Sequence, residues 1–165
     1  MTLVEKKQEL IADLAHARGA QERLAWLVAR ARRQPPLEAA FKTEAFRVEG
    51  CLSKLWLVAE RREGHCLFRC DSDSQIVKAI AGVLCEFYSG HAPAEILVHE
   101  PGFLGQLGIT QHLTGNRRNA LTRVWERIRA FAQSQLGSTE RSAEALVHAP
   151  AQPGAGSADE GIRAP

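Results

Sequence analysis

The sequence lacks several features that would place it in a familiar class of protein. No apolar run approaches the roughly 20 residues that are needed to cross a bilayer. Met1 to Leu10 carries charged side chains in place of the apolar segment of a signal peptide. We therefore expect a cytoplasmic protein without a membrane partner. A marked positive charge is also lacking, since 21 Lys and Arg oppose 19 Asp and Glu, so we expect no nucleic-acid partner.

The cysteines lack the spacing of a structural metal site. Cys51, Cys66, Cys70 and Cys85 include no CxxC pair, and thiols of a cytoplasmic protein are expected to be reduced. Free cysteine is among the most buried residue types. Core packing is therefore the simplest interpretation of Cys66, Cys70 and Cys85.

Apolar periodicity predicts helices on either side of a small sheet. Helical spacing covers 3–16 and 21–32, with Gly19 as a candidate C-cap of the first helix. Two apolar segments, 54–60 and 65–71, are joined by a short polar turn and predict an antiparallel pair of strands. This order of elements predicts an α+β fold.

Further helices are expected after the strands, followed by a change in composition. They are a long helix with the capping-box pattern Ser72-x-x-Gln75, two short helices that begin at Pro93 and Pro101, and a last long helix from about Asn116 to Gly137. Residues 138–165 are rich in Ala, Gly, Ser and Pro and show no apolar period. We predict one domain over 1–137 and a disordered tail over 138–165.

Cys51 differs from the other cysteines in its context. It follows Gly50, precedes the first predicted strand and has polar neighbours. Glycine permits a tight turn that presents the next side chain at a loop tip, and Arg47 and Lys54 could favour the thiolate that attacks sulfur. Local context alone leaves two alternatives open, a reactive thiol and a cysteine that packs at the edge of a loop.

Other nucleophile motifs are weaker. The chain has no GxSxG elbow. His112 is the most suggestive histidine, but a simpler role is hydrogen bonding near the start of the last helix.

Three motifs resemble, in order and spacing, those of the SufE/CsdE family of sulfur-acceptor proteins. The segment 48–56 (VEGCLSKLW) resembles V-x-G-C-x-S-x-V-W, 71–78 (DSDSQIVK) resembles D-S-D-[SA]-x-I-V-[KR], and 111–121 (QHLTGNRRNAL) is similar to H-L-[ST]-x-S-R-x-x-G-L. Ala79 and Ala120 stand where glycines are usual, which affects backbone detail and leaves the cysteine motif unchanged.

The resemblance implies a function that depends on Cys51. It implies a fold shared with U-type iron–sulfur scaffold proteins and docking on a PLP-dependent cysteine desulfurase of the SufS or CsdA type. Cys51 would accept persulfide sulfur and pass it to a downstream scaffold or acceptor for iron–sulfur cluster assembly. The supporting residues implied by the motifs are Gly50, Arg117, Asp71, Asp73 and His112.

The PLP chemistry belongs to the partner, so we expect no cofactor and no metal in this chain. We expect Leu52, Leu55 and Trp56 to shelter Cys51 partly, because an exposed thiolate is readily oxidised. Oligomeric state is left open, and a homodimer is one option.

Two alternatives remain at this point. One is a metal or iron–sulfur scaffold that uses Cys51, Cys66, Cys70 and a histidine such as His65, which requires about four converging ligands. The other is an activator that stimulates a desulfurase without using Cys51.

Overall fold

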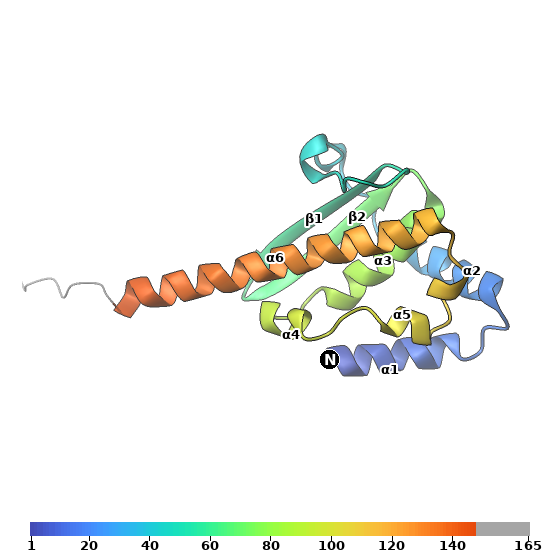
Figure 1. The fold of residues 1–165 in the computed structure, drawn as a ribbon, viewed down its shortest axis with the longest axis horizontal. Coiled ribbons are helices and arrows are strands. Elements are labelled where there is room, and N and C mark those ends of the chain that lie inside the picture. The colour runs from blue at the N-terminus through green and yellow to red at the C-terminus, as the bar shows by residue number, and fades with distance from the viewer. Residues whose placement is uncertain (148–165) are drawn as a thin grey trace, which may run out of the picture.

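The computed structural model describes residues 1–147 of the chain and the side chains of residues 1–137. Helices pack against one side of an antiparallel pair of strands (Figure 1), which confirms the predicted α+β fold. The elements in chain order are α1 (Leu3–Leu14), α2 (Ala20–Arg32), the 3₁₀ turns η1 (Ala39–Phe41) and η2 (Glu44–Phe46), β1 (Leu55–Arg62), β2 (His65–Ser72), α3 (Gln75–Tyr88), α4 (Pro93–Leu97), α5 (Phe103–Gln106), the 3₁₀ turn η3 (Thr110–His112) and α6 (Gly115–Val147).

The strands form a hairpin whose register is continuous over its whole length. Leu55 lies opposite Ser72, and Arg62 lies opposite His65. Glu63 and Gly64 form the turn, with φ of 52° and 82°. Positive φ at both central residues matches the right-handed twist of the strands that such a two-residue turn joins.

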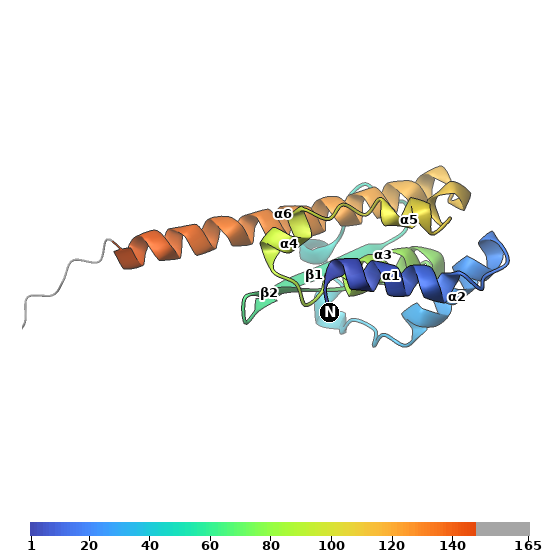
Figure 2. The ribbon, with the colours of Figure 1, turned by 90° about the horizontal axis from the view of Figure 1, so that it is seen from below.

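The core lies between α3, α6 and the sheet. Ile80 and Leu84 of α3 are 1% and 0% exposed, and Val124 and Ile128 of α6 are both 0% exposed. Fully burying an aliphatic side chain of this size contributes roughly 1.5–3 kcal/mol. Figure 2 shows the long α6 passing over the sheet on one side, with α1 and α3 beneath it. This packing fixes the first half of α6 relative to the end of β2.

Two of the predicted helix caps are wrong. Gly19 does not end α1, which stops at Leu14, but is the N-cap of α2. Ser72 does not cap α3 either, because it still belongs to β2. Ser74 is the N-cap instead, and its Oγ accepts a hydrogen bond from Val77 N at 3.3 Å. The pattern in the sequence fits a cap at either serine, and only the length of the strand decides between them.

The predicted end of the last helix at Gly137 is also wrong, because α6 continues to Val147. A single glycine costs a helix about 1 kcal/mol relative to alanine, which does not stop a helix whose following residues favour it. Residues 148–165 of the predicted tail lie outside the described residues, and the division at 137/138 stays a prediction. No helix within residues 1–147 is long and apolar enough to cross a membrane.

Asp71 is a buried carboxylate, 4% exposed, near the end of β2. Its Oδ2 accepts a hydrogen bond from Leu37 N at 3.2 Å and pairs with Lys42 Nζ at 3.1 Å. Its Oδ1 accepts from Ser72 N at 2.8 Å and pairs with Lys78 Nζ at 3.3 Å. Burial acts to raise the pKa of Asp71, but the hydrogen bonds and the two ammonium groups outweigh it and hold that pKa below its usual value.

We predict that Asp71→Asn lowers the free energy of unfolding by about 2 kcal/mol at neutral pH, because hydrogen bonds to a charged group are lost. A lowered pKa in the folded state means that the carboxylate stabilises the protein above its unfolded pKa of about 4 and loses this effect as the pH falls further. Urea unfolding across pH 3–7 should therefore show the two proteins converging in acid.

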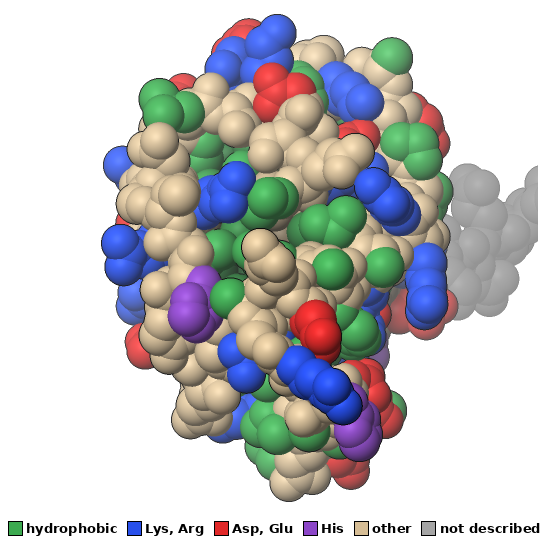
Figure 3. Space-filling view, turned by 90° about the vertical axis from the view of Figure 1, so that its right-hand side faces the viewer, with side chains coloured by type: hydrophobic (Ala, Val, Ile, Leu, Met, Phe, Trp, Pro, Cys, Tyr) green, Lys and Arg blue, Asp and Glu red, His purple; other side chains and the backbone are tan. Residues whose placement is uncertain are grey.

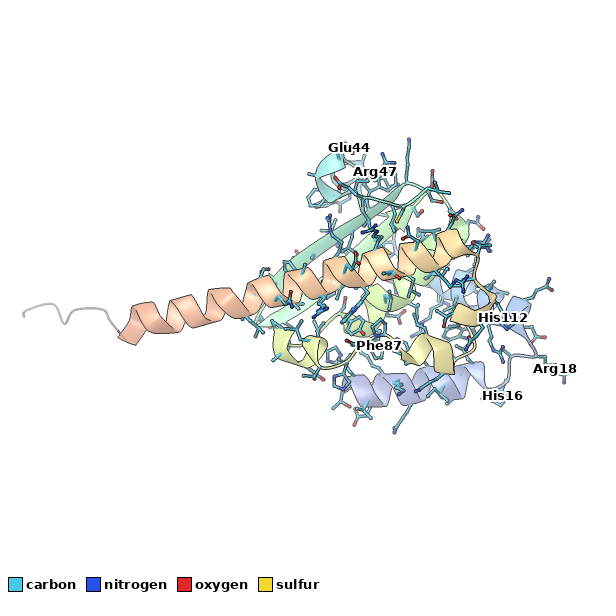
Figure 4. All side chains as sticks on the ribbon, in the orientation of Figure 1. His16, Arg18, Glu44, Arg47, Phe87 and His112 are labelled. Atoms are coloured by element: carbon cyan, nitrogen blue, oxygen red, sulfur yellow. The ribbon has the colours of Figure 1, made fainter. Side chains whose placement is uncertain are left out.

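Glu44→Gln is the matched control. Glu44, the first residue of η2, pairs with Arg47 at 3.2 Å on the surface (Figure 4), and exposed pairs of this kind contribute little. Its urea midpoint should equal that of the wild type. Equal stability of Asp71→Asn and wild type at neutral pH would contradict the role of the buried carboxylate.

Candidate functional site around Cys51

Cys51 lies on a short loop that begins and ends in a β-type contact. Val48 N donates to Leu55 O at 2.8 Å, and Arg47 forms an isolated antiparallel bridge with Trp56. Residues 49–54 therefore project from the start of β1 as a closed loop. Gly50 has a φ of 80°, a conformation that glycine adopts without steric cost. The glycine thus sets the turn that orients the next residue, Cys51.

The turn between β2 and α3 holds the loop from one side. Asp73 Oδ1 accepts from Lys54 N at 3.0 Å, and Asp73 N donates to Lys54 O at 3.2 Å. The Oγ of Ser72 donates to the same Lys54 carbonyl at 2.7 Å. Asp73 thus clamps the backbone at the end of the loop that carries Cys51.

Helix α6 holds the loop from the other side. Asn119 Nδ2 donates to Gly50 O at 2.6 Å, and Arg127 Nη1 donates to Arg47 O at 3.5 Å. The guanidinium of Arg123 lies over Gly50 so closely that a Cβ there would be 3.0 Å from its Nε. Glycine is therefore favoured at position 50 by its positive φ, and a Cβ there would push the Arg123 guanidinium aside by a few tenths of an ångström.

A hollow of about 300 Å³ opens beside the cysteine. It lies between the first turns of α3 and α6, since Ser74 caps one helix and the Oγ of Thr114 accepts from Arg117 N at 3.4 Å in the other. Helix N-termini carry partial positive charge and favour anions. The lining residues are Cys51, Leu52, Ser53, Ser74, Val77, Thr114, Asn116, Arg117 and Ala120.

The surroundings of Cys51 act on its thiol in opposite directions. The side chain is half-buried, and burial raises the pKa of Cys51, while the charge of Arg123 lowers it without cancelling the effect. The resting thiol is therefore mostly protonated at neutral pH. A protonated thiol attacks sulfur poorly and resists oxidation.

Comparison with known proteins identifies the fold and the family. A family model described as SufE, Fe-S metabolism associated domain, matches residues 8–132. The chain belongs to the SufE family. It is thereby associated with iron–sulfur metabolism. Figure 3 shows the end of this SufE domain where α6 begins, with Lys and Arg side chains around a group of hydrophobic ones.

Relatives of the domain occur in bacteria and plants. An uncharacterised SufE-like protein of Synechocystis is 29% identical over 119 residues, which cover 72% of this chain and 73% of the relative. SufE-like protein 1 of Arabidopsis thaliana, chloroplastic/mitochondrial, is 39% identical over 87 residues, 52% of this chain and 24% of that protein. A solution structure of a hypothetical protein from Thermus thermophilus superimposes with a TM-score of 0.64 at 23% identity, over 83% of this chain and 99% of the other.

The predicted supporting residues of the SufE motifs fall into two groups. Gly50, Asp73 and Arg117 lie around Cys51, the first two in the loop and its clamp and the third in the lining of the hollow. Asp71 does not line this hollow, because its carboxylate points into the buried ion-pair cluster described above.

His112 does not line the hollow either. It lies in η3 with an exposed side chain, at the end of the molecule where α6 begins (Figure 4). Thr114 takes the hydrogen-bonding role at the start of α6 that the sequence suggested for this histidine.

The expected shelter of Cys51 is only partly correct. Of the three apolar residues proposed for it, Leu52 lines the hollow but is 81% exposed, while Leu55 is 0% exposed in the core and Trp56 lies outside the lining. Val77 and Ala120 supply the apolar lining instead.

The sequence also missed the residues of α6 that act on the loop. Asn119, Arg123 and Arg127 contact it from successive turns of the helix, whereas Arg47 and Lys54 were expected to act on the thiol. The spacing of four residues is visible in the sequence. The loop that these helix residues contact cannot be inferred from the spacing, because the contact joins segments about 70 residues apart.

The alternative of a scaffold metal centre finds no support in the geometry. Among the residues that the structure describes, no three His, Cys, Asp or Glu side chains come together as a metal site. Cys66 lies opposite Arg61 near the hairpin turn, whereas the Cys51 loop precedes Leu55 at the other end of β1.

We predict that Arg123→Gln raises the pKa of Cys51 further, because the lowering charge is removed while the burial remains. The pH profile of Cys51 alkylation by iodoacetamide, followed by peptide mass spectrometry, should shift to higher pH. Arg129→Gln is the control, since Arg129 lies on the same helix with an exposed side chain, and its profile should match the wild type. Identical profiles for both variants would exclude an effect of Arg123 on the thiol.

A pair of glycine substitutions separates backbone strain from the arginine contact. Gly50→Ala and Gly64→Ala both place a side chain at a φ near 80° (80° and 82°), which costs roughly 1–2 kcal/mol each. Only at Gly50 does the new Cβ meet the Arg123 guanidinium; nothing lies within 4 Å at Gly64. Both variants should lose similar stability, and only Gly50→Ala should change the alkylation rate of Cys51. A changed rate in Gly64→Ala would refute this separation.

Proposed function

We propose that this chain is a sulfur acceptor for a PLP-dependent cysteine desulfurase, and that Cys51 takes the persulfide sulfur. The observation that carries the proposal is the position of the thiol. It sits half-buried on a loop clamped from two sides, at the edge of a hollow formed by two helix N-termini. A core cysteine would have neither the surface loop nor the hollow.

The proposed reaction is a thiol exchange. The Cys51 thiolate attacks the terminal sulfur of the desulfurase persulfide, R–S–SH. The new S–S bond forms as the old one breaks, R–S⁻ leaves, and Cys51 carries –S–SH. One negative charge is present before and after the step, so no oxidant or reductant is needed. The positive ends of α3 and α6 favour the anions that enter and leave the hollow.

Docking would change the balance that keeps the thiol protonated. Leu52 is 81% exposed beside Cys51, and its burial by a partner would contribute up to about 1.5–3 kcal/mol to binding. A partner loop that enters the hollow brings its persulfide to the thiol and supplies groups to accept the Cys51 proton. The exchange would therefore be fast only in the complex, and the free thiol stays protected from oxidation.

The finer parts of this proposal rest on the family resemblance. They are the SufS or CsdA type of the desulfurase, a downstream scaffold that takes the sulfur, and a cytoplasmic location.

The proposal predicts a specific mass change. Incubation with a desulfurase and free cysteine should add about 32 Da, the mass of one sulfur atom, to the peptide that contains Cys51. Cys51→Ser should show no adduct and keep its fold by circular dichroism, because serine preserves the size of the side chain. Cys70→Ser is the matched control, since Cys70 is equally half-buried but lies away from the hollow. It should acquire the adduct on Cys51 as the wild type does.

The opposite pattern would exclude the assignment. Persulfide on Cys51→Ser would place the sulfur acceptor at another cysteine. Stimulation of the desulfurase by that variant to the level of the wild type would favour an activator that does not use this thiol.

A further inference from the structure

Two thiols remote from Cys51 meet between β2 and α3. Cys70, on β2, is half-buried, and Cys85, on α3, is 4% exposed. Both line a second cavity of about 190 Å³, which also includes Phe68, Gly82 and Pro35. None of its lining residues belongs to the hollow beside Cys51.

The two sulfurs of this cavity interact with each other. A hydrogen bond to Cys70, then burial, then the charge of Cys70 raise the pKa of Cys85 well above its usual value. Cys66 differs, because it is buried without lining the cavity. The chain therefore holds a pair of adjacent reduced thiols at the wall of a cavity.

We propose that Cys70 and Cys85 together bind one soft monovalent cation of the Cu⁺ kind. Thiolate is a soft ligand that favours Cu⁺, Zn²⁺ and iron–sulfur clusters, and two sulfurs are enough for linear coordination of Cu⁺. Zn²⁺ requires about four ligands, and within the described residues no third His, Cys, Asp or Glu side chain joins the pair as a metal site. The small number of ligands is what selects the monovalent ion.

The charged side chains that line the cavity suit the anionic complex that binding would form. Binding follows 2 R–SH + M⁺ → (R–S)₂M⁻ + 2 H⁺, so the occupied site carries one negative charge and both protons leave to solvent. Lys78 and Arg69 line the cavity and add positive charge to its wall, although Lys78 also pairs with Asp71 at 3.3 Å and Arg69 lies over the ring of Phe41. Glu86 also lines it, but its carboxylate is held by Arg30 at 2.6 and 2.8 Å.

This site does not depend on the proposed role of Cys51, and the test removes that residue. The full chain with Cys51→Ser, kept reduced, is titrated with Ag⁺, a probe that does not change its oxidation state. Native mass spectrometry should show one Ag⁺ per chain. A pH electrode in weak buffer should record close to two protons released per Ag⁺, as the stoichiometry of the binding equation requires.

Single substitutions in the same background test each ligand. Cys70→Ala and Cys85→Ala should each weaken Ag⁺ binding at least about 100-fold, a loss larger than that typical of residues that only support a ligand. Cys66→Ala is the matched control, because it removes a buried thiol outside the cavity, and it should bind Ag⁺ as the background does. Cys70 is half-buried, so its variant should fold and decide the question even where Cys85→Ala is unstable.

Two results would overturn the proposal. One is a background protein that binds no Ag⁺ at equimolar concentration. The other is a folded Cys70→Ala variant that retains the affinity and proton release of the background, since the ion would then lie elsewhere.

Discussion

The clamp on the backbone of residues 49–54 is the constraint on which the site depends. Lys54 is held through both its N–H and its carbonyl by Asp73 and Ser72, and the Gly50 carbonyl is held by Asn119. Each contact joins the loop to an element whose own position is fixed by the core. The packing of α6 on α3 is therefore translated directly into the position of the Cys51 thiol. A loop of this length without such contacts would sample many conformations, and ordering it would cost roughly 1–2 kcal/mol per residue.

The clamp also explains why the site combines opposing influences on one thiol. A loop pressed against α6 must exclude water from Cys51, and burial raises the pKa of the thiol. The same approach brings the Arg123 guanidinium to Gly50 and the first turn of α6 to the hollow. Burial protects the sulfur from oxidation, and the positive groups lower the free energy of the thiolate form. Both effects come from the same packing, so neither can be strengthened without changing the other.

Local sequence signals predicted most of the fold and the loop position of Cys51, and long-range contacts account for the errors. The strands and the start of α3 follow from apolar runs and nearby polar turns, but the choice between Ser72 and Ser74 as the cap depends on how far β2 pairs with β1. Gly137 looks like a stop because a helix end is usually a local signal, yet α6 passes through it. The motifs pointed to Gly50, Asp73 and Arg117, which the structure places around Cys51. Arg123 was missed because its partner is the bare backbone of a distant glycine, which leaves no trace in local composition.

The end of β2 shows how one short strand serves several purposes. Successive strand residues point to opposite faces, so Cys70 and Ser72 share one side and Asp71 takes the other. Cys70 faces the second cavity, Asp71 binds the connector between α2 and β1, and Ser72 holds the cysteine loop through Lys54. Because pairing with β1 fixes the register, none of these contacts can shift alone. A one-residue slip would expose Asp71 and release the loop together, so the pairing that builds the sheet is also what keeps Cys51 in place.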